Sequence, residues 1–302
     1  MARAALDPVE RYRAQAEQIT QGATGVRLDV PDGPEDEITR LGTTLNAMLA
    51  AQERSAERQQ QFIDDASHEL RTPLSTLAAE VELALRKPRT AEAHEATLRR
   101  IATDTTQLVE LAEELLALGA LGSTLPAAAS IPARELLEAA ARRARGQLDT
   151  ERSRRVSVQV PDGLVTHGDP ALLGRALGNI VDNAVRYGNG GITLDGAALD
   201  DHPIPACLYS VHDDGPGMPA DFLPHAAERF RQDQSSRAGP GAGLGLSLVD
   251  AIMTAHHGQL RICSAGHHHH QPTAEIALAR VPCRHPDDGT TVSLLLPGAT
   301  AD

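Results

Sequence analysis

One stretch of the chain, residues 61–85, constrains the fold more than any other. Its apolar residues recur at steps of three and four, the spacing of one face of an α-helix: Ile63, Ala66, Leu70, Leu74, Leu77, Val81 and Ala84. Pro73 lies inside this pattern, and we expect a local loosening there because proline removes one helix hydrogen bond. The stripe predicts a helix that buries one side against partner helices.

His68 lies two residues from Ala66 and two from Leu70, so it falls on the side of the helix opposite the apolar stripe. The pattern predicts an exposed imidazole with charged neighbours, of which Glu69 is one. A neighbouring carboxylate can accept one ring proton and leave the other nitrogen as a nucleophile. The alternative is that His68 is only a solvated surface residue.

Residues 91–118 carry a second helical pattern, with a heptad seam formed by Leu98, Ile101, Thr105, Leu108, Ala112 and Leu115. Two antiparallel helices cannot cover two apolar seams by themselves. A four-helix bundle built from two chains can, and this predicts a homodimer.

The segments on either side of these helices differ in pattern. Residues 7–60 predict two helices with a connector, and the second runs without a breaker into the His68 helix; the alternative is a plain helical spacer. Residues 119–131 are rich in Gly, Pro and Ala and predict a linker. Beyond it, helical and strand patterns mix with short returns, which predicts a two-layer α/β sandwich on a mostly antiparallel sheet. The expected fold class is therefore α + α/β.

Composition excludes several classes of function. The net charge of −13 argues against a nucleic-acid partner, which requires a basic face. The three cysteines lack CxxC spacing, which fits a reducing compartment without a disulfide frame or a zinc ribbon. No apolar run reaches about 18 residues and no signal peptide is evident, so we expect a cytoplasmic chain.

A predicted helix at 170–187 carries a narrow polar stripe at positions i, i+4, i+7 and i+8: Asn179, Asn183, Arg186 and Tyr187. Amide oxygens on such a stripe can hold Mg²⁺, which prefers hard oxygen ligands and shares them with substrate phosphates. The remaining positions of the helix are largely apolar. The stripe is therefore expected to face a cleft or a buried network.

Two glycine-containing segments follow. In the first, Asp213 could accept a hydrogen bond from an exocyclic amine, and Gly215 and Gly217 permit sharp turns. The second precedes an apolar helix and offers backbone N–H groups to phosphate; it contains Gly241, Gly243, Leu244, Gly245 and Leu246. Neither segment has the spacing of a P-loop or of a dinucleotide-binding fingerprint.

Taken together and in this order, the motifs resemble those of two-component sensor histidine kinases with a GHKL-type ATP-binding domain. SHELRTPL at 67–74 resembles the phosphoacceptor box, NIVDNAVRYG at 179–188 the N box, and DDGPG and GAGLGL the two glycine boxes, with a remnant ERF at 228–230. Residues 1–60 resemble a HAMP signal-conversion module, with Pro8, Glu37, Asn46 and Met48 at its marker positions.

The resemblance implies a division into a HAMP-like module at 1–56, a dimerisation and phosphoacceptor hairpin at 57–120, and a catalytic ATP-binding domain at 130–298. It implies that ATP phosphorylates His68, with Glu69 as base. It also implies that Thr72 orients water during dephosphorylation, and that the phosphoryl group passes to an aspartate in the receiver domain of a response regulator.

Nucleotide contacts are implied in the same way. Asn183 would bind Mg²⁺, with Asn179, Arg186 and Tyr187 on phosphates and nucleotide. Asp213 would read adenine, and the glycines of 241–245 would hinge a lid over ATP.

Three departures from the family pattern stand out. Ala227 replaces a usual aromatic near the lid. Residues 265–289 interrupt the last hairpin and predict an inserted loop. In it, the histidines at 267–270 and 285 suggest metal binding, but a loop run of histidines is more often solvated, so we expect no metal cluster. The third departure is the lack of a membrane helix before the HAMP-like module. Because family members are usually anchored in the inner membrane, we expect a chain truncated relative to a membrane-bound parent.

Two other functions stay open. One is a catalytically weak family member that acts as a phosphatase or dimeric scaffold, which Ala227 and the insertion favour. The other is an ATPase of the same nucleotide-domain plan, such as a DNA-repair or chaperone type. His68 in its box and the dimerisation seam count against the latter.

Overall fold

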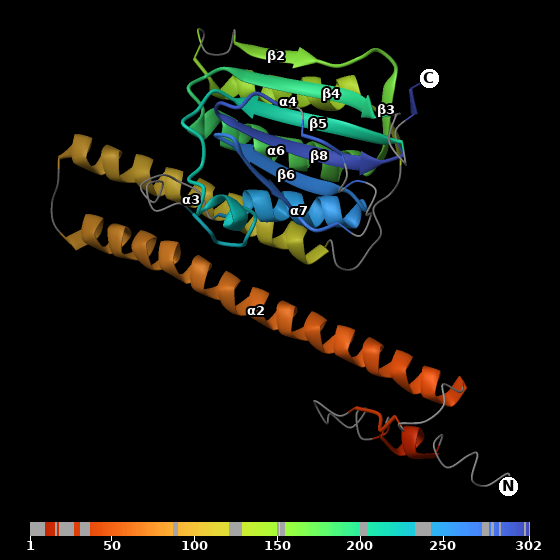
Figure 1. Cartoon of the computed structure of the whole chain (residues 1–302). Coiled ribbons are helices and arrows are strands. Elements are labelled where there is room, and N and C mark those ends of the chain that lie inside the picture. The colour runs from red at the N-terminus through yellow and green to blue at the C-terminus, as the bar shows by residue number, and fades with distance from the viewer. Residues whose placement is uncertain are drawn as a thin grey trace, which may run out of the picture. The chain divides into compact units, whose positions relative to one another are not determined.

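The computed structural model describes most of the chain (Figure 1). It divides into two compact units, Met1–Thr72 and Pro73–Asp302, and each unit is described by itself. The described residues are 10–15, 17, 27–30, 37–86, 90–120, 129–149, 151, 155–199, 205–232, 243–273, 278, 281–283, 285–298 and 300–301.

The first unit contains most of helix α2 (Glu37–Arg86), a single helix of 50 residues. The expected continuity into the His68 segment is confirmed, and the helix continues through Pro73. Residues 10–15 are also helical, whereas Pro8 and most of the predicted connector lie outside the described residues.

One of the expected marker residues joins α2 to the segment at 27–30. The Asn46 side chain accepts a hydrogen bond from the Leu28 backbone N–H at 2.8 Å and donates one to the Leu28 carbonyl at 2.9 Å. A Cβ at Gly42 would lie 2.4 Å from the Tyr12 hydroxyl oxygen, so only glycine fits beside that ring.

The second unit begins with the end of α2 and with α3 (Ala91–Ala120). Arg100 of α3 forms an ion pair with Glu80 of α2, at 3.8 Å between Nε and Oε1. The turn at 87–89 and residues 121–128 lie outside the described residues. The linker prediction at 119–131 is wrong at both ends, because α3 continues to Ala120 and Ala129–Pro132 form strand β1, paired with β3.

The rest of this unit is a two-layer α/β sandwich (Figure 1). Six strands run in the order β2-β4-β5-β8-β6-β7, antiparallel except for the β2–β4 pair, and three strands form a second sheet in the order β1-β3-β9. The remaining elements are α4 (Ala133–Gln147), β2 (Val156–Gln159), β3 (Leu164–Gly168), α6 (Pro170–Tyr187), β4 (Ile192–Leu199), β5 (Ala206–Asp213), the 3₁₀ turn η1 (Leu223–His225), α7 (Gly245–Ala255), β6 (Gln259–Ser264), β7 (His267–His270), β8 (Thr290–Pro297) and β9 (Thr300–Ala301).

The two faces of the larger sheet differ in chemistry, because successive side chains of a strand point to opposite faces. One cross-strand row consists of buried apolar residues: Leu194, Val211, Val292 and Ile262. This inner face packs against α4, α6 and α7. The next row is polar and belongs to the outer face: Asp195, Ser210, Ser293 and Arg261.

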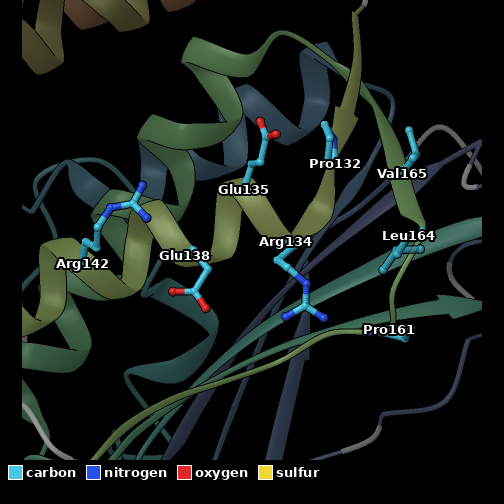
Figure 2. A pocket seen from close by; sticks show the side chains of 9 residues that line it. Pro132, Arg134, Glu135, Glu138, Arg142, Pro161, Leu164 and Val165 are labelled. Atoms are coloured by element: carbon cyan, nitrogen blue, oxygen red, sulfur yellow. The ribbon is translucent and has the colours of Figure 1, made fainter.

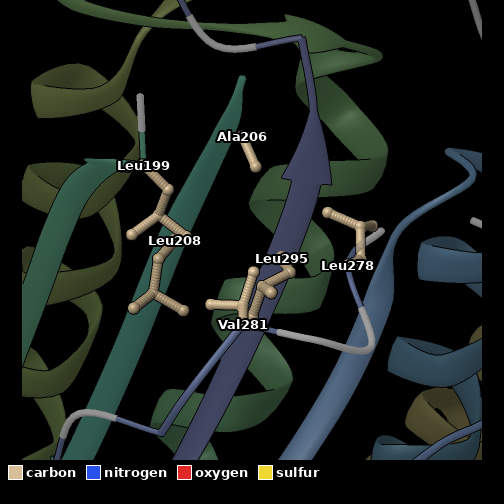
Figure 3. Close-up of a cluster of buried hydrophobic side chains, with 6 residues drawn as sticks. All are labelled: Leu199, Ala206, Leu208, Leu278, Val281 and Leu295. Carbon is tan, nitrogen blue, oxygen red and sulfur yellow. The ribbon is translucent and has the colours of Figure 1, made fainter. Parts of the chain in front are cut away.

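Part of the outer face is covered by the segment that interrupts the last hairpin. Leu278 and Val281 lie on the sheet beside Leu208 and Leu295 and are buried there (Figure 3). The prediction of an inserted loop at 265–289 is therefore wrong in part, because His267–His270 form strand β7 and two further residues join a hydrophobic cluster.

Among the described helices, none has a stretch long and apolar enough to cross a bilayer.

Candidate functional site

His68 is exposed on α2, as the position opposite the apolar stripe predicts. One turn later, the Thr72 hydroxyl donates to the His68 carbonyl at 3.3 Å. Glu69 is exposed as well. The His68 imidazole is therefore on the exposed surface of the helix.

Helix α6 positions the predicted polar stripe in the second unit. It starts where the Asp169 carboxylate accepts the N–H groups of Ala171 and Leu172, at 2.8 and 3.1 Å, with Pro170 in the first turn. Its buried residues fix the rotation of the helix: Leu173, Ala176, Leu177, Gly178, Ile180, Val181 and Ala184. The sequence prediction for this helix is confirmed.

The polar stripe lies at the margin of that buried face. Asn179 and Asn183 are half-buried, whereas Arg186 and Tyr187 are exposed. The Arg186 guanidinium lies over the Tyr187 ring, 5.2 Å from its centroid. The Asn179 amide donates to the carbonyl of Gly245, at 3.3 Å, and so joins α6 to the first residue of α7.

The Asp213 carboxylate lies at the end of β5 and is buried. It accepts the Gly215 backbone N–H at 2.9 Å and also interacts with the Thr290 backbone N–H. Burial is the largest influence on this carboxyl and raises its pKa to about 6; the charge of Asp214 acts in the same direction.

The loop after Asp213 lies against the C-terminal end of α6. A Cβ at Gly215 would come within 2.5 Å of the Tyr187 carbonyl oxygen, so this close approach requires glycine. Gly217 has a φ of +82°, and the next N–H, of Met218, donates to the Ser264 hydroxyl at 2.7 Å.

Two residues that sequence reasoning missed support this loop. Ser264, at the end of β6, accepts the Met218 N–H and donates to the Gly289 carbonyl at 3.1 Å. The Asp214 carboxylate accepts the N–H groups of Asn189 and Gly191, each at 3.0 Å. Asp214 could have been found from its place in DDGPG, whereas no local signal marks Ser264.

The second glycine segment is described from Gly243 onward, and Gly241 lies outside the described residues. Gly243 has a φ of +69°, and its carbonyl accepts the Phe230 N–H at 3.0 Å, so the ERF remnant contacts this segment. Gly245 starts α7, and the flanking Leu244 and Leu246 are buried. The segments at 179–188, 213–217 and 243–246 are thus brought together.

A separate pocket lies elsewhere in this unit, between α4, β1 and β3 (Figure 2). It is lined by Pro132, Arg134, Glu135, Glu138, Arg142, Pro161, Gly163, Leu164 and Val165. None of these residues belongs to the motifs, and its charged side chains are of both signs. We therefore do not assign the candidate site to this pocket.

Comparison with known families matches three consecutive parts of the chain. Residues 1–54 match the HAMP domain, residues 58–124 the His Kinase A (phospho-acceptor) domain, and residues 168–300 the histidine kinase-, DNA gyrase B-, and HSP90-like ATPase.

Individual proteins agree with these matches. The chain is 35% identical over 268 residues to the signal transduction histidine-protein kinase/phosphatase MprB of Mycolicibacterium vanbaalenii, covering 87% of this chain and 54% of that one. It is 31% identical over 293 residues to the probable sensor histidine kinase TcrY of Mycobacterium tuberculosis, covering 86% and 58%. The chain thus spans about half the length of the curated relatives it matches.

A solved structure shares the fold. The Acinetobacter baumannii histidine kinase AdeS matches with a TM-score of 0.51 at 17% identity, covering 76% of this chain and 97% of that one. The three family matches, the relatives and the fold lead to one conclusion. The chain belongs to the two-component sensor histidine kinases, and its C-terminal domain is an ATP-binding domain of their ATPase family.

Proposed function

We propose that this chain is an ATP-dependent histidine autokinase that phosphorylates His68 and transfers the phosphoryl group to an aspartate of a response-regulator receiver domain. The observation that carries the proposal is the convergence of three separate segments in the second unit. Asn179 hydrogen-bonds Gly245 at the start of α7, and the other end of α6 meets the loop after Asp213.

The residues of this site fit a magnesium nucleotide. Asn183 supplies a half-buried amide oxygen for Mg²⁺, and Asn179 lies one turn before it. Mg²⁺, when bound, would neutralise phosphate charge and orient the phosphates for transfer. Arg186 contacts phosphate and Tyr187 the nucleotide, from the exposed end of the stripe.

The other end of the nucleotide is read by Asp213, whose carboxylate accepts a hydrogen bond from the adenine amino group. Backbone N–H groups of the second glycine segment, Gly241, Gly243, Leu244, Gly245 and Leu246, hold phosphate oxygens at the start of α7. The buried leucines of this segment anchor it to the core while the glycines hinge the lid.

In the transfer step, a ring nitrogen of His68 forms a bond to the γ-phosphorus of ATP. The bond between that phosphorus and the bridging oxygen breaks, and ADP leaves with the electron pair. Glu69 takes the ring proton. The exposure of His68 on a helix supports this role, because the acceptor nitrogen must approach a phosphate in line.

The same chain is also proposed to remove phosphate from its partner. Thr72, one helical turn after His68, orients the attacking water. We propose the domain bounds 1–56, 57–120 and 130–298 for the HAMP-like module, the phosphoacceptor hairpin and the catalytic domain. We also propose that the hairpins of two chains form a four-helix bundle.

The proposal is tested by incubating the full chain with γ-labelled ATP and Mg²⁺. The expected product carries an acid-labile, base-stable label that His68→Gln abolishes. His94→Gln is the matched control, because His94 is another exposed histidine on a helix. Label that persists in His68→Gln, or that is lost equally in His94→Gln, contradicts the assignment of His68.

A further inference from the structure

Two cysteines and two histidines gather at one point on the outer face of the sheet, away from the nucleotide motifs. They are Cys263 on β6, His268 on β7, and Cys283 and His285 in the segment that returns to β8. One ligand atom from each lies within 4.8 Å of all the others. No step of the proposed kinase mechanism uses these four residues.

The distances between these ligand atoms agree with those around a tetrahedral ion. The two Sγ atoms lie 3.7 Å apart, and the His285 Nε2 and His268 Nδ1 atoms lie 3.3 Å apart. Zn–S bonds of about 2.3 Å and Zn–N bonds of about 2.0–2.1 Å would give about 3.8 Å between sulfurs and about 3.3 Å between nitrogens. The mixed pair, Cys263 Sγ and His268 Nδ1, is 3.3 Å apart, against about 3.6 Å for the ideal geometry.

The strand pairing fixes half of this cluster. Cys263 lies directly opposite His268 in the antiparallel β6–β7 pair, so both side chains point to the same face. His267 and His269 lie on the other face of β7 by the same alternation. The histidine run is therefore divided between the two faces of the sheet.

Buried contacts fix the other half. The guanidinium of Arg261, which is 2% exposed, donates to the carbonyls of Leu278 and Val281, each at 2.6 Å. These two side chains join the hydrophobic cluster over the sheet (Figure 3). These contacts fix the segment that carries Cys283 against β6, and so they help to position this ligand.

We propose that Cys263, His268, Cys283 and His285 bind one Zn²⁺ ion as a tetrahedral Cys₂His₂ site. Binding converts two thiols to thiolates and releases two protons. The buried Arg261 guanidinium places a positive charge that interacts electrostatically with both cysteines. His270 lies 3.1 Å from the Cys283 sulfur through Nε2 and supports that ligand from outside the tetrahedron.

The site is distinct from the nucleotide site but is joined to it by one peptide unit. Cys263 points to the outer face, whereas the next residue, Ser264, points to the inner face and holds the Met218 N–H. The zinc proposal does not rest on the proposed kinase function, because its residues, its geometry and its test are independent of phosphorylation.

The test uses the full chain, reduced and stripped of metal by a chelator, and titrated first with Co²⁺ and then with Zn²⁺. We expect one equivalent of Co²⁺ per chain, with the intense visible bands of a tetrahedral site and thiolate-to-cobalt charge transfer, and displacement by Zn²⁺. In Cys283→Ser, the zinc affinity measured by chelator competition should fall by about 100-fold or more.

Two matched variants locate the site. His267→Ala removes a histidine of the same run from the opposite face, and Cys207→Ala removes a buried cysteine of β5; both should bind Zn²⁺ like the unmodified chain. Circular dichroism verifies that each variant is folded. The proposal is overturned if the reduced chain binds no metal, if charge transfer is absent, or if Cys283→Ser and His267→Ala lose affinity equally.

Discussion

At the scale of single residues, Asp213 meets two opposing demands. Burial favours the neutral carboxylic acid and raises the pKa to about 6, whereas the proposed hydrogen bond from the adenine amino group favours the carboxylate. Because the raised pKa belongs to the folded state, Asp213 destabilises the fold as the pH rises from the unfolded pKa of about 4 towards 6. Nucleotide binding has the opposite linkage, because it favours loss of the proton.

The linkage predicts that ADP binds more weakly as the pH falls below about 6, by up to about tenfold per pH unit. Calorimetric titration from about one pH unit below that pKa to about two units above it would measure this. Asp213→Asn has no titratable group at this position, so its profile reports the titration of the phosphates and of the remaining side chains. If the two profiles run parallel, the role of Asp213 in reading adenine is wrong.

Asn183 carries the proposed magnesium contact by a half-buried amide on α6. Asn183→Ala removes the oxygen ligand without touching the buried face, so we expect autophosphorylation to fall on the order of 100-fold while the helix content is unchanged. Asn183→Asp restores a hard oxygen ligand and should recover part of the rate. Equal rates for Asn183→Ala and the unmodified chain would contradict the magnesium role.

At the scale of elements, the end of β6 supports the loop that follows Asp213. Ser264→Ala leaves the part-buried Met218 N–H without its acceptor, which costs about 1 kcal/mol. We expect ATP affinity to fall about tenfold through loosening of that loop.

Ser210→Ala is the matched control for this element. Ser210 is also a buried serine, and its hydroxyl forms a hydrogen bond with the Ser293 hydroxyl on the outer face, at 2.9 Å. Among the described residues, this hydroxyl forms no hydrogen bond with the loop that follows Asp213. Both variants should lose stability to denaturant, but only Ser264→Ala should lose ATP affinity. A similar loss of ATP affinity in the two variants would mean that Ser264 contributes only to the overall stability of the fold.

Elements with a clear periodicity were predictable from the sequence. The helix predicted at 170–187 coincides with α6, and the continuous helical pattern coincides with α2. β1 was not predictable, because it lies in a Gly/Pro/Ala-rich stretch and forms only by pairing with β3. β7 was missed because four identical histidines carry no alternation and depend on β6 for their register.

The same reasoning separates the two sites. The residues proposed to bind nucleotide lie in short contiguous motifs, so the sequence indicates them directly. Ser264 and the Cys₂His₂ cluster arise from contacts between residues distant in the chain, through the β6–β8 pairing and the anchoring of Leu278 and Val281. His268 is exposed, as the sequence predicts, but its register opposite Cys263 could not be predicted because it depends on the pairing of β7 with β6.

At the scale of the whole molecule, the helices of the hairpin carry apolar side chains that the single chain leaves uncovered. In the second unit, the exposed fractions are 52% for Leu74, 63% for Leu98 and 74% for Leu116. A run of such residues along helices marks an association surface. This agrees with the proposed four-helix bundle of two chains, in which Leu98 belongs to the heptad seam of α3.

The bundle proposal predicts that one charge in the seam dissociates the dimer. Burying a leucine contributes about 1.5–3 kcal/mol, and a symmetric dimer loses two copies, so Leu98→Glu should raise the dimer dissociation constant by about 100-fold to 10⁴-fold. Glutamate is a good helix former, so α3 itself should persist. Thr103→Glu adds the same charge at an exposed position two residues from Ile101 and Thr105, off the seam, and should leave the dimer intact. Sedimentation equilibrium of both variants distinguishes the cases: a Leu98→Glu chain that remains dimeric places the association surface elsewhere than on this seam.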